Sequence, residues 1–162
     1  MKKCGKLISV TENNLREQMQ DRKEAPMSVE REDALGNIKL NDAVFARLLL
    51  HAIACTEGKA APASEKGKLL GGMNQKVSAG EAAANLKFWE EPERYCMEFY
   101  IIISFGASIQ KVTDRILNEL AAQLAKLLPD KGGHLVLRIV GIKSKKIAER
   151  NIEVVKDYEP AR

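Results

Sequence analysis

The clearest pattern of apolar and polar positions in the chain is a strand, a helix and a second strand. Residues 97–105 are almost continuously apolar, which predicts a strand in the middle of a sheet with a covered face. Its odd-numbered positions form one face: Met97, Phe99, Ile101, Ile103 and Phe105. Residues 108–128 predict a helix with three-and-four spacing of Ile109, Val112, Ile116, Leu117, Leu120, Leu124 and Leu127. Residues 134–143 alternate again, so the two strands are expected to be parallel, with a right-handed crossover.

Shorter elements flank this unit on both sides. Residues 37–40 predict a strand, and the wide apolar stripe of residues 43–55 predicts a helix that is covered on more than one side. Asn41 and Asp42 come before this helix, and their side chains can accept hydrogen bonds from its first N–H groups. The other predicted strands are 86–89 and 147–157.

The remaining segments are polar. Residues 1–33 predict a flexible tail, because their few apolar side chains bury too little surface to offset the entropy of ordering. Residues 56–84 predict a long connection rich in Gly, Ala, Ser and Lys, with one helical turn at 69–73. The folded domain is therefore expected over residues 34–157, followed by a short tail at 158–162.

These elements predict an α/β protein of the α+β kind. We expect a two-layer sandwich in which a small mixed β-sheet carries two main helices, packed mostly on one face. The length of 162 residues and the apolar content of 45% suit one domain with one core.

Composition also bears on where the protein acts. No stretch approaches the roughly 20 continuous apolar residues of a membrane span, and the charged N-terminus lacks the apolar run of a signal peptide. Three widely spaced cysteines favour free thiols in a reducing compartment, with Cys55 and Cys96 as small buried hydrophobes and Cys4 in the tail. We therefore expect a cytoplasmic protein without direct membrane insertion, which could lie at the inner face of the cell membrane through a partner.

The net charge of +4 is concentrated near the end of the chain. Residues 131–162 carry eight basic and four acidic side chains, whereas the rest of the chain is balanced. The best candidate for an anion or partner contact is the basic tract of Lys143, Lys145, Lys146 and Arg150. It could attract phosphates or anionic lipid heads, although no aromatic residue between Phe105 and Tyr158 offers a platform for stacking bases. Solubility is the favoured interpretation of this charge, and nucleic acid is not the expected partner.

One pair of residues has the spacing of metal ligands. His51 and Cys55 lie four positions apart on a predicted helix, so both could reach one metal ion. The further ligands would have to come from distant positions such as Cys96 or His134. A packed helix face is the favoured interpretation, for a metal site as well as for a Cys–His nucleophile, and we expect no metal.

Two other polar groups are also better explained without chemistry. The carboxylates Glu90, Glu91 and Glu93 could act as an acid–base pair, but around a proline a solvated turn is favoured. The Gly-Lys pairs at 58–59 and 67–68 lack the preceding glycine of a phosphate-binding loop. We therefore expect no catalytic residue and no cofactor.

Three motifs follow one another along the predicted domain. The first is a short strand opened by Gly36 and followed by a helix with Ala43-Val44. The second is an aromatic-Gly run with Phe105, Gly106, Ile109, Val112 and Ile116. The third is the apolar strand that closes at Gly141-Ile142. In these motifs the chain resembles the alkaline-shock-protein family of bacterial envelope-stress proteins, although Lys59 stands where the family has a valine.

The resemblance implies a small, cytoplasmic, non-enzymatic protein, with no active-site residues to carry over. Proteins of this family are linked to cell-envelope stress in Gram-positive bacteria, and some self-associate at the membrane through an anchoring partner. We therefore expect a scaffold or adaptor of the envelope stress response or envelope homeostasis, as a homo-oligomer or with a membrane-anchored protein partner. A regulator of lipid or fatty-acid metabolism is the alternative within the family. A nucleic-acid-binding module that uses the C-terminal basic tract is the alternative outside it.

Overall fold

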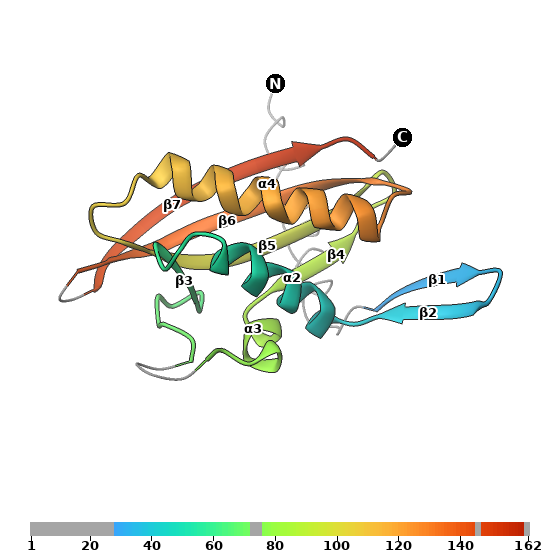
Figure 1. Cartoon of the computed structure of the whole chain (residues 1–162), viewed down its shortest axis with the longest axis horizontal. Helices are drawn as coiled ribbons and strands as arrows, with labels where there is room; N and C mark the ends of the chain where they lie inside the picture. The colour runs from blue at the N-terminus through green and yellow to red at the C-terminus, as the bar shows by residue number, and fades with distance from the viewer. Residues whose placement is uncertain (1–27, 72–75, 145–146, 161–162) are drawn as a thin grey trace, which may run out of the picture.

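The computed structural model describes residues 28–71, 76–144 and 147–160 (Figure 1). Within these ranges, helices and strands follow the order β1-β2-α2-β3-α3-β4-β5-α4-β6-β7. Five strands form one mixed sheet, β1 and β2 form a separate hairpin, and the helices pack against the sheet. The predicted α+β class is confirmed.

The centre of the sheet is the predicted strand–helix–strand unit. β5 (Arg94–Ser104) and β6 (Gly132–Lys143) are parallel neighbours. α4 (Ile109–Leu127) connects them, and the Ser108 side chain caps its first turn by accepting from the N–H of Lys111. The parallel pair and its crossover helix are therefore as predicted.

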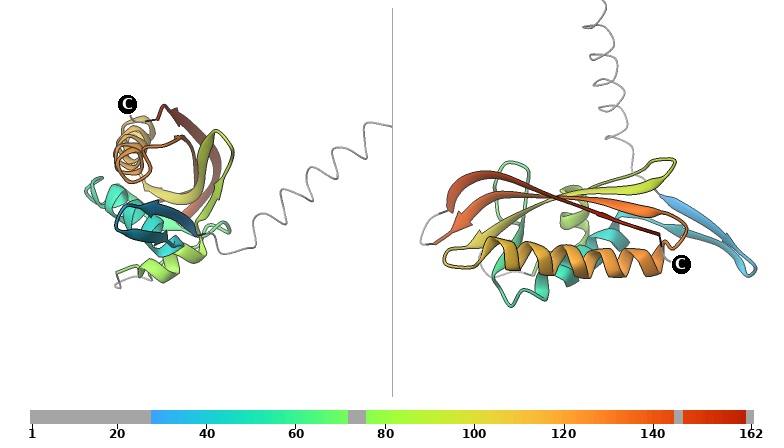
Figure 2. Two further views of the ribbon diagram at one scale, coloured as in Figure 1. Left: turned by 90° about the vertical axis from the view of Figure 1, so that its right-hand side faces the viewer. Right: turned by 90° about the horizontal axis from the view of Figure 1, so that it is seen from above.

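Antiparallel strands complete the sheet on both sides. β7 (Ile147–Tyr158) pairs with β6 and forms one edge. At the other edge, β4 (Lys87–Glu90) and β3 (Ala60–Ala63) pair with successive halves of β5. Figure 2 shows that the sheet is strongly twisted and that α4 runs along its length.

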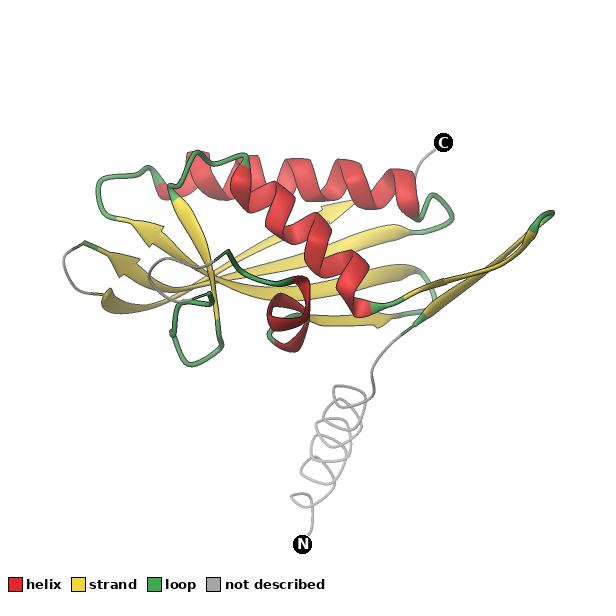
Figure 3. Cartoon of the chain, turned by 60° about the horizontal axis from the view of Figure 1, so that its bottom comes forward, coloured by secondary structure: helices red, strands yellow, loops and turns green. Residues whose placement is uncertain are grey.

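One face of the sheet carries the helices and the main core. α2 (Asp42–Ala54) and α4 lie on this face, and the short α3 (Ala79–Ala84) lies beside α2 (Figure 3). The core under them contains fully buried large side chains from both layers: Phe45, Met97, Phe99, Ile101, Ile103, Ile116, Leu120, Leu124, Leu135 and Leu137. Each such side chain contributes about 1.5–3 kcal/mol through removal of apolar surface from water. Phe45 of α2 stacks on Phe88 of β4 with ring centroids 3.9 Å apart, which joins the first helix to the edge of the sheet.

Two polar segments of the sequence contain more structure than predicted. Residues 29–33, assigned to the tail, form β1 (Val29–Asp33), which pairs with β2 (Gly36–Leu40). Val29 and Leu40 enter the main core, and this burial anchors the hairpin despite its polar sequence. Residues 1–27 of the expected tail lie outside the described residues. At the other end of the domain, β7 extends one residue beyond the expected boundary, to Tyr158.

The long connection at 56–84 is likewise not structureless, because it contains β3 and α3. The helical turn predicted at 69–73 is wrong over its described part. Leu69 instead forms an isolated antiparallel bridge with Ala63, and the Leu70 N–H donates to the carbonyl of Pro62. Residues 72–75 lie outside the described residues. Pairing with the edge of β5 organises this segment, and a local pattern does not reveal such pairing.

Two local details also differ from expectation. Asn41 is the N-cap residue of α2, but its side chain makes no capping hydrogen bond. Phe105, expected on the core face of the central strand, is 78% exposed. β5 ends one residue earlier, and the chain then turns at Gly106 with a φ of +84°, which directs Phe105 away from the core.

Candidate functional site

The sheet face opposite the helices carries a cluster of charged side chains at its centre. Because side chains alternate along β5, Phe99 points to the helices, whereas Glu98 and Tyr100 point to the opposite face. Strand pairing places Lys87 of β4 opposite Glu98, and Arg138 of β6 opposite Tyr100. Two consecutive strands, β4 and β5, and the distant strand β6 thus bring four polar side chains together.

Glu98 is the centre of this charged network. Its Oε1 accepts hydrogen bonds from the Tyr100 hydroxyl at 2.7 Å and from Arg138 Nε at 3.0 Å. Lys87 Nζ donates to the Tyr100 oxygen at 3.0 Å and lies 3.9 Å from Glu98 Oε1. The Tyr100 hydroxyl therefore bridges the two charged groups, because it accepts from Lys87 and donates to Glu98.

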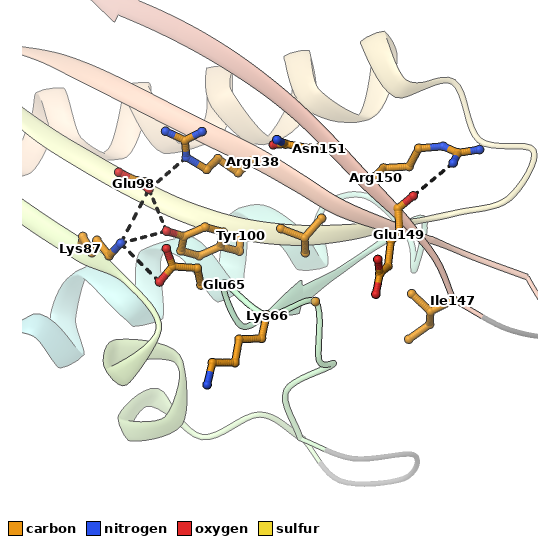
Figure 4. A pocket seen from close by; sticks show the side chains of 12 residues that line it. Glu65, Lys66, Lys87, Glu98, Tyr100, Arg138, Ile147, Glu149, Arg150 and Asn151 are labelled. Carbon is orange, nitrogen blue, oxygen red and sulfur yellow. Dashed lines mark hydrogen bonds and ion pairs between the residues drawn. The ribbon is translucent and has the colours of Figure 1, made fainter.

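Two outer carboxylates, Glu65 and Glu153, complete the network, and Figure 4 shows Glu65 beside Lys87. Glu65 lies 3.6 Å from Lys87 Nζ, and Glu153 of β7 lies 2.6 Å from Arg138 Nη1. The side chains of Glu65 and Glu153 are 68% and 44% exposed, whereas the Glu98 side chain is only 10% exposed. The network is thus buried at Glu98 and reaches solvent at both ends.

The pKa values agree with a stable network of ion pairs. Burial alone would raise the pKa of Glu98, but the Tyr100 hydrogen bond and the charges of Lys87 and Arg138 outweigh it and hold this pKa below its ordinary value. For Tyr100, burial is the main cause of a raised pKa. Glu98 is therefore an anion at neutral pH, whereas a general acid needs a raised carboxyl pKa. The geometry suits binding and structural support better than proton transfer.

A broad groove of about 680 Å³ lies over this network. Its volume is within the range of small-molecule sites, roughly 300–1,000 Å³, but its walls are mainly polar, whereas most such sites are mainly apolar. The lining side chains come from the β3–α3 connection and from β4 to β7: Glu65, Lys66, Lys87, Glu98, Tyr100, Arg138, Val140, Ile147, Glu149, Arg150 and Asn151. Its charges are nearly balanced, so it does not select strongly for one sign.

The predicted basic tract only partly joins this groove. Arg150 lines it, but its side chain points away from the Glu98 network, and its Nη1 donates to the carbonyl of Glu149 (Figure 4). Lys143 is exposed at the end of β6. Lys145 and Lys146 lie outside the described residues. The described part of the tract is therefore one exposed lysine and one arginine beside an acidic neighbour.

The acidic turn at residues 90–93 is a surface feature, as predicted. Glu91 accepts from Arg94 Nε at 2.7 Å and from Trp89 Nε1 at 3.3 Å, and Glu90 pairs with Lys131. The hydrogen bond from Arg94 is the main cause of a lowered pKa at Glu91. These carboxylates hold the β4–β5 turn against the start of β6.

The pair His51 and Cys55 lies at the solvent side of the contact between α2 and α4. The residue that comes near them is Glu119 of α4, rather than the expected Cys96 or His134. Cys96 is buried on β5, and His134 of β6 pairs with Asp157 of β7. Burial of Cys96 confirms its interpretation as a small hydrophobe, whereas Cys55 is only partly buried.

A second exposed feature is the β1–β2 hairpin, which projects from one end of the body (Figures 1 and 2). Its base is held by Val29 and Leu40, which are 5% and 8% exposed. Farther out, Leu35 in the turn is 98% exposed and Ile38 is 51% exposed. The hairpin therefore presents apolar side chains to solvent on an anchored arm.

Sequence reasoning missed the Glu98 network and the hairpin. One signal for the network was available: Glu98 and Tyr100 occupy alternate positions in an apolar strand, and Arg138 interrupts the next apolar strand. Lys87 stands in the short predicted strand at 86–89, which is too brief to give a comparable signal, and Glu65 lies in the polar connection and gave none.

Comparisons of the chain with models of protein families, with curated proteins and with solved structures gave no match. Among the described residues, the structure has no helix with the length and apolar character to cross a membrane.

Proposed function

We propose that this protein is a non-enzymatic scaffold or adaptor that acts through contacts with other protein chains, including copies of itself. The observation that carries the proposal is the projecting β1–β2 hairpin with its exposed Leu35 and Ile38. A two-stranded hairpin is only marginally stable by itself, so burial of its apolar residues against a partner would stabilise both the arm and the complex.

The edge of the sheet supports the same proposal. β7 is twelve residues long, and one side of it pairs with no other strand among the described residues. A long edge strand offers free N–H and C=O groups to an added strand, and Glu149, Arg150 and Glu153 along it would restrict which strand can pair there. Hairpin and edge together give a scaffold two surfaces for assembly.

The cell-envelope setting of this proposal comes from the resemblance to alkaline-shock proteins. In that setting the chain would take part in envelope stress or homeostasis on the cytoplasmic side, with a membrane-anchored protein as one partner. A lipid-metabolism role would use the same surfaces with a different partner.

Light scattering during size-exclusion chromatography tests the proposal directly. The wild-type chain should have a mass above one protomer that increases with concentration, and L35E/I38E should return it to one protomer. The matched control is F105E, which replaces another exposed apolar side chain, away from the hairpin. Equal effects of L35E/I38E and F105E would contradict a specific role of the hairpin.

The same experiment distinguishes a nucleic-acid-binding protein from a self-associating scaffold. Excess absorbance at nucleic-acid wavelengths that disappears at high salt, and is reduced by K143E/R150E, would favour the basic tract. A monomer at every concentration would exclude self-association and leave the hairpin as a site for a different chain.

A further inference from the structure

A second polar cluster lies between the two main helices, away from the charged groove. His51 and Cys55 stand at the C-terminal end of α2, four residues apart and hence on one side of the helix. Glu119 and Gln123 stand four residues apart on α4. The packing of α2 on α4 brings these two pairs face to face.

The distances in this cluster are close to those of a metal site. One potential ligand atom from each of His51, Cys55 and Glu119 lies within 4.8 Å of the other two, and His51 Nδ1 lies 3.8 Å from Glu119 Oε1. Ligands around a tetrahedral ion with bonds of about 2.0–2.3 Å are separated by roughly 3.3–3.8 Å. Small rotations of these partly exposed side chains would therefore close the site.

Gln123 supplies an independent observation. Its Nε2 lies 2.6 Å from Glu119 Oε1 and 2.8 Å from His51 Nδ1, so the amide donates to both atoms. A cation bound by these two acceptors would take the place of the amide N–H groups. Its Oε1 is buried and has no hydrogen-bond partner among the described residues. Rotation of the amide toward a bound cation would give this oxygen a partner, whereas its present position leaves a buried acceptor unsatisfied.

We propose that His51, Cys55 and Glu119 form a binding site for a divalent metal ion of the zinc class. A set of one imidazole, one thiolate and one carboxylate suits Zn²⁺, which accepts N, S and O ligands in tetrahedral geometry. Gln123 Oε1 or a water molecule would fill the fourth position. The ion would join α2 to α4 outside the apolar core and fix the angle between the helices that cover the sheet.

Titration of the reduced full-length chain with ZnCl₂ tests this site. The C4S variant is used as the background so that the thiol of Cys4, which lies outside the described residues, cannot bind the metal. One Zn²⁺ per chain is expected, and at about 100 times the dissociation constant the melting temperature should rise by about 5 °C or more. With Co²⁺ as the probe, thiolate-to-metal charge-transfer absorption should appear and should be lost in C55S.

Variants of the individual ligands decide the outcome. Loss of a residue that only supports a metal ligand weakens metal binding about 10–100-fold. His51, Cys55 and Glu119 are proposed as direct ligands, so H51Q, C55S and E119Q should each weaken binding by at least about tenfold. H134Q is the matched control, because His134 is the other histidine and pairs with Asp157. These side chains are at least partly exposed, and far-ultraviolet circular dichroism checks that each variant folds.

Q123E gives a test in the opposite direction. A second carboxylate beside Glu119 should lower the melting temperature without metal and increase the affinity for Zn²⁺, so that zinc restores the stability. Zn²⁺ binding that is unchanged in H51Q and E119Q would indicate a single-thiol contact and overturn the proposal. Absence of binding by the wild-type chain would overturn it as well.

Discussion

The two faces of β5 are stabilised in different ways. Toward the helices, Phe99 and its neighbours bury apolar surface, and their contribution follows the area removed from water. On the opposite face, Glu98 contributes only while Tyr100, Lys87 and Arg138 surround it, because a buried charge without partners is costly. On one face of β5, stability thus depends on how well apolar side chains fill the core. On the other face, it depends on whether the charged side chains keep their partners.

The largest expected effect comes from the apolar face. F99A should destabilise the protein by about 3–5 kcal/mol, because it leaves a cavity under the helices. Y100F, at the next position on the opposite face, removes a hydroxyl with two hydrogen bonds and should cost only about 1–2 kcal/mol. Urea unfolding followed by circular dichroism measures both. A larger cost for Y100F than for F99A would contradict the proposed difference between the faces.

The charged face should show strong coupling between its members. E98L leaves Arg138 and Lys87 without their shared carboxylate and should cost about 2–3 kcal/mol, at the lower end for buried pairs because both cations are partly exposed. In E98L/R138L the guanidinium that lost Glu98 is gone as well, so part of this loss should be recovered, less what Arg138 gains from Glu153. A double-mutant cycle in urea measures the coupling. Strictly additive costs would show that the pair does not act as a unit.

The difference between the faces also explains how much could be predicted. A helix or strand with one apolar face shows its period locally, so α4, β5 and β6 were predicted within a few residues. The Glu98 network depends on which strands are neighbours and in which register, as when Lys87 meets Glu98 across the ladder. Sequence spacing does not contain this information.

The same argument applies to the elements and ligands that were missed. β1 and β3 have little apolar pattern, and pairing with β2 and β5 gives them their structure. His51 and Cys55 were recognised as a pair because both lie on one helix. Their nearest carboxylate, on α4, depends on the packing of α2 against α4.

Acid should weaken the charged face through protonation of Glu98. Glu98 has an ordinary pKa of 4.5 in the unfolded chain and a lower pKa in the folded protein. Between these values the unfolded chain binds more protons, so the contribution of Glu98 is complete above about pH 4.5 and is lost as the pH falls through the folded pKa. Urea midpoints between pH 7 and pH 3 should fall less steeply for E98Q than for wild type. Parallel curves would exclude Glu98 as a source of acid sensitivity.

The smallest effect on stability is expected from changes at the thiols. Their reaction rates test how well the face away from the helices excludes solvent. Cys96 lies beside Trp89 in the ladder on the face away from the helices, and burial first, with Glu91 second, raises its pKa to about 12. Cys55 is only partly buried. In a C4S chain, Ellman's reagent should therefore modify Cys55 within minutes and leave Cys96 unmodified until the protein unfolds. W89A should make Cys96 reactive if the indole is what excludes solvent. Rapid modification of Cys96 in the otherwise wild-type chain would mean that this end of the face opens readily without global unfolding.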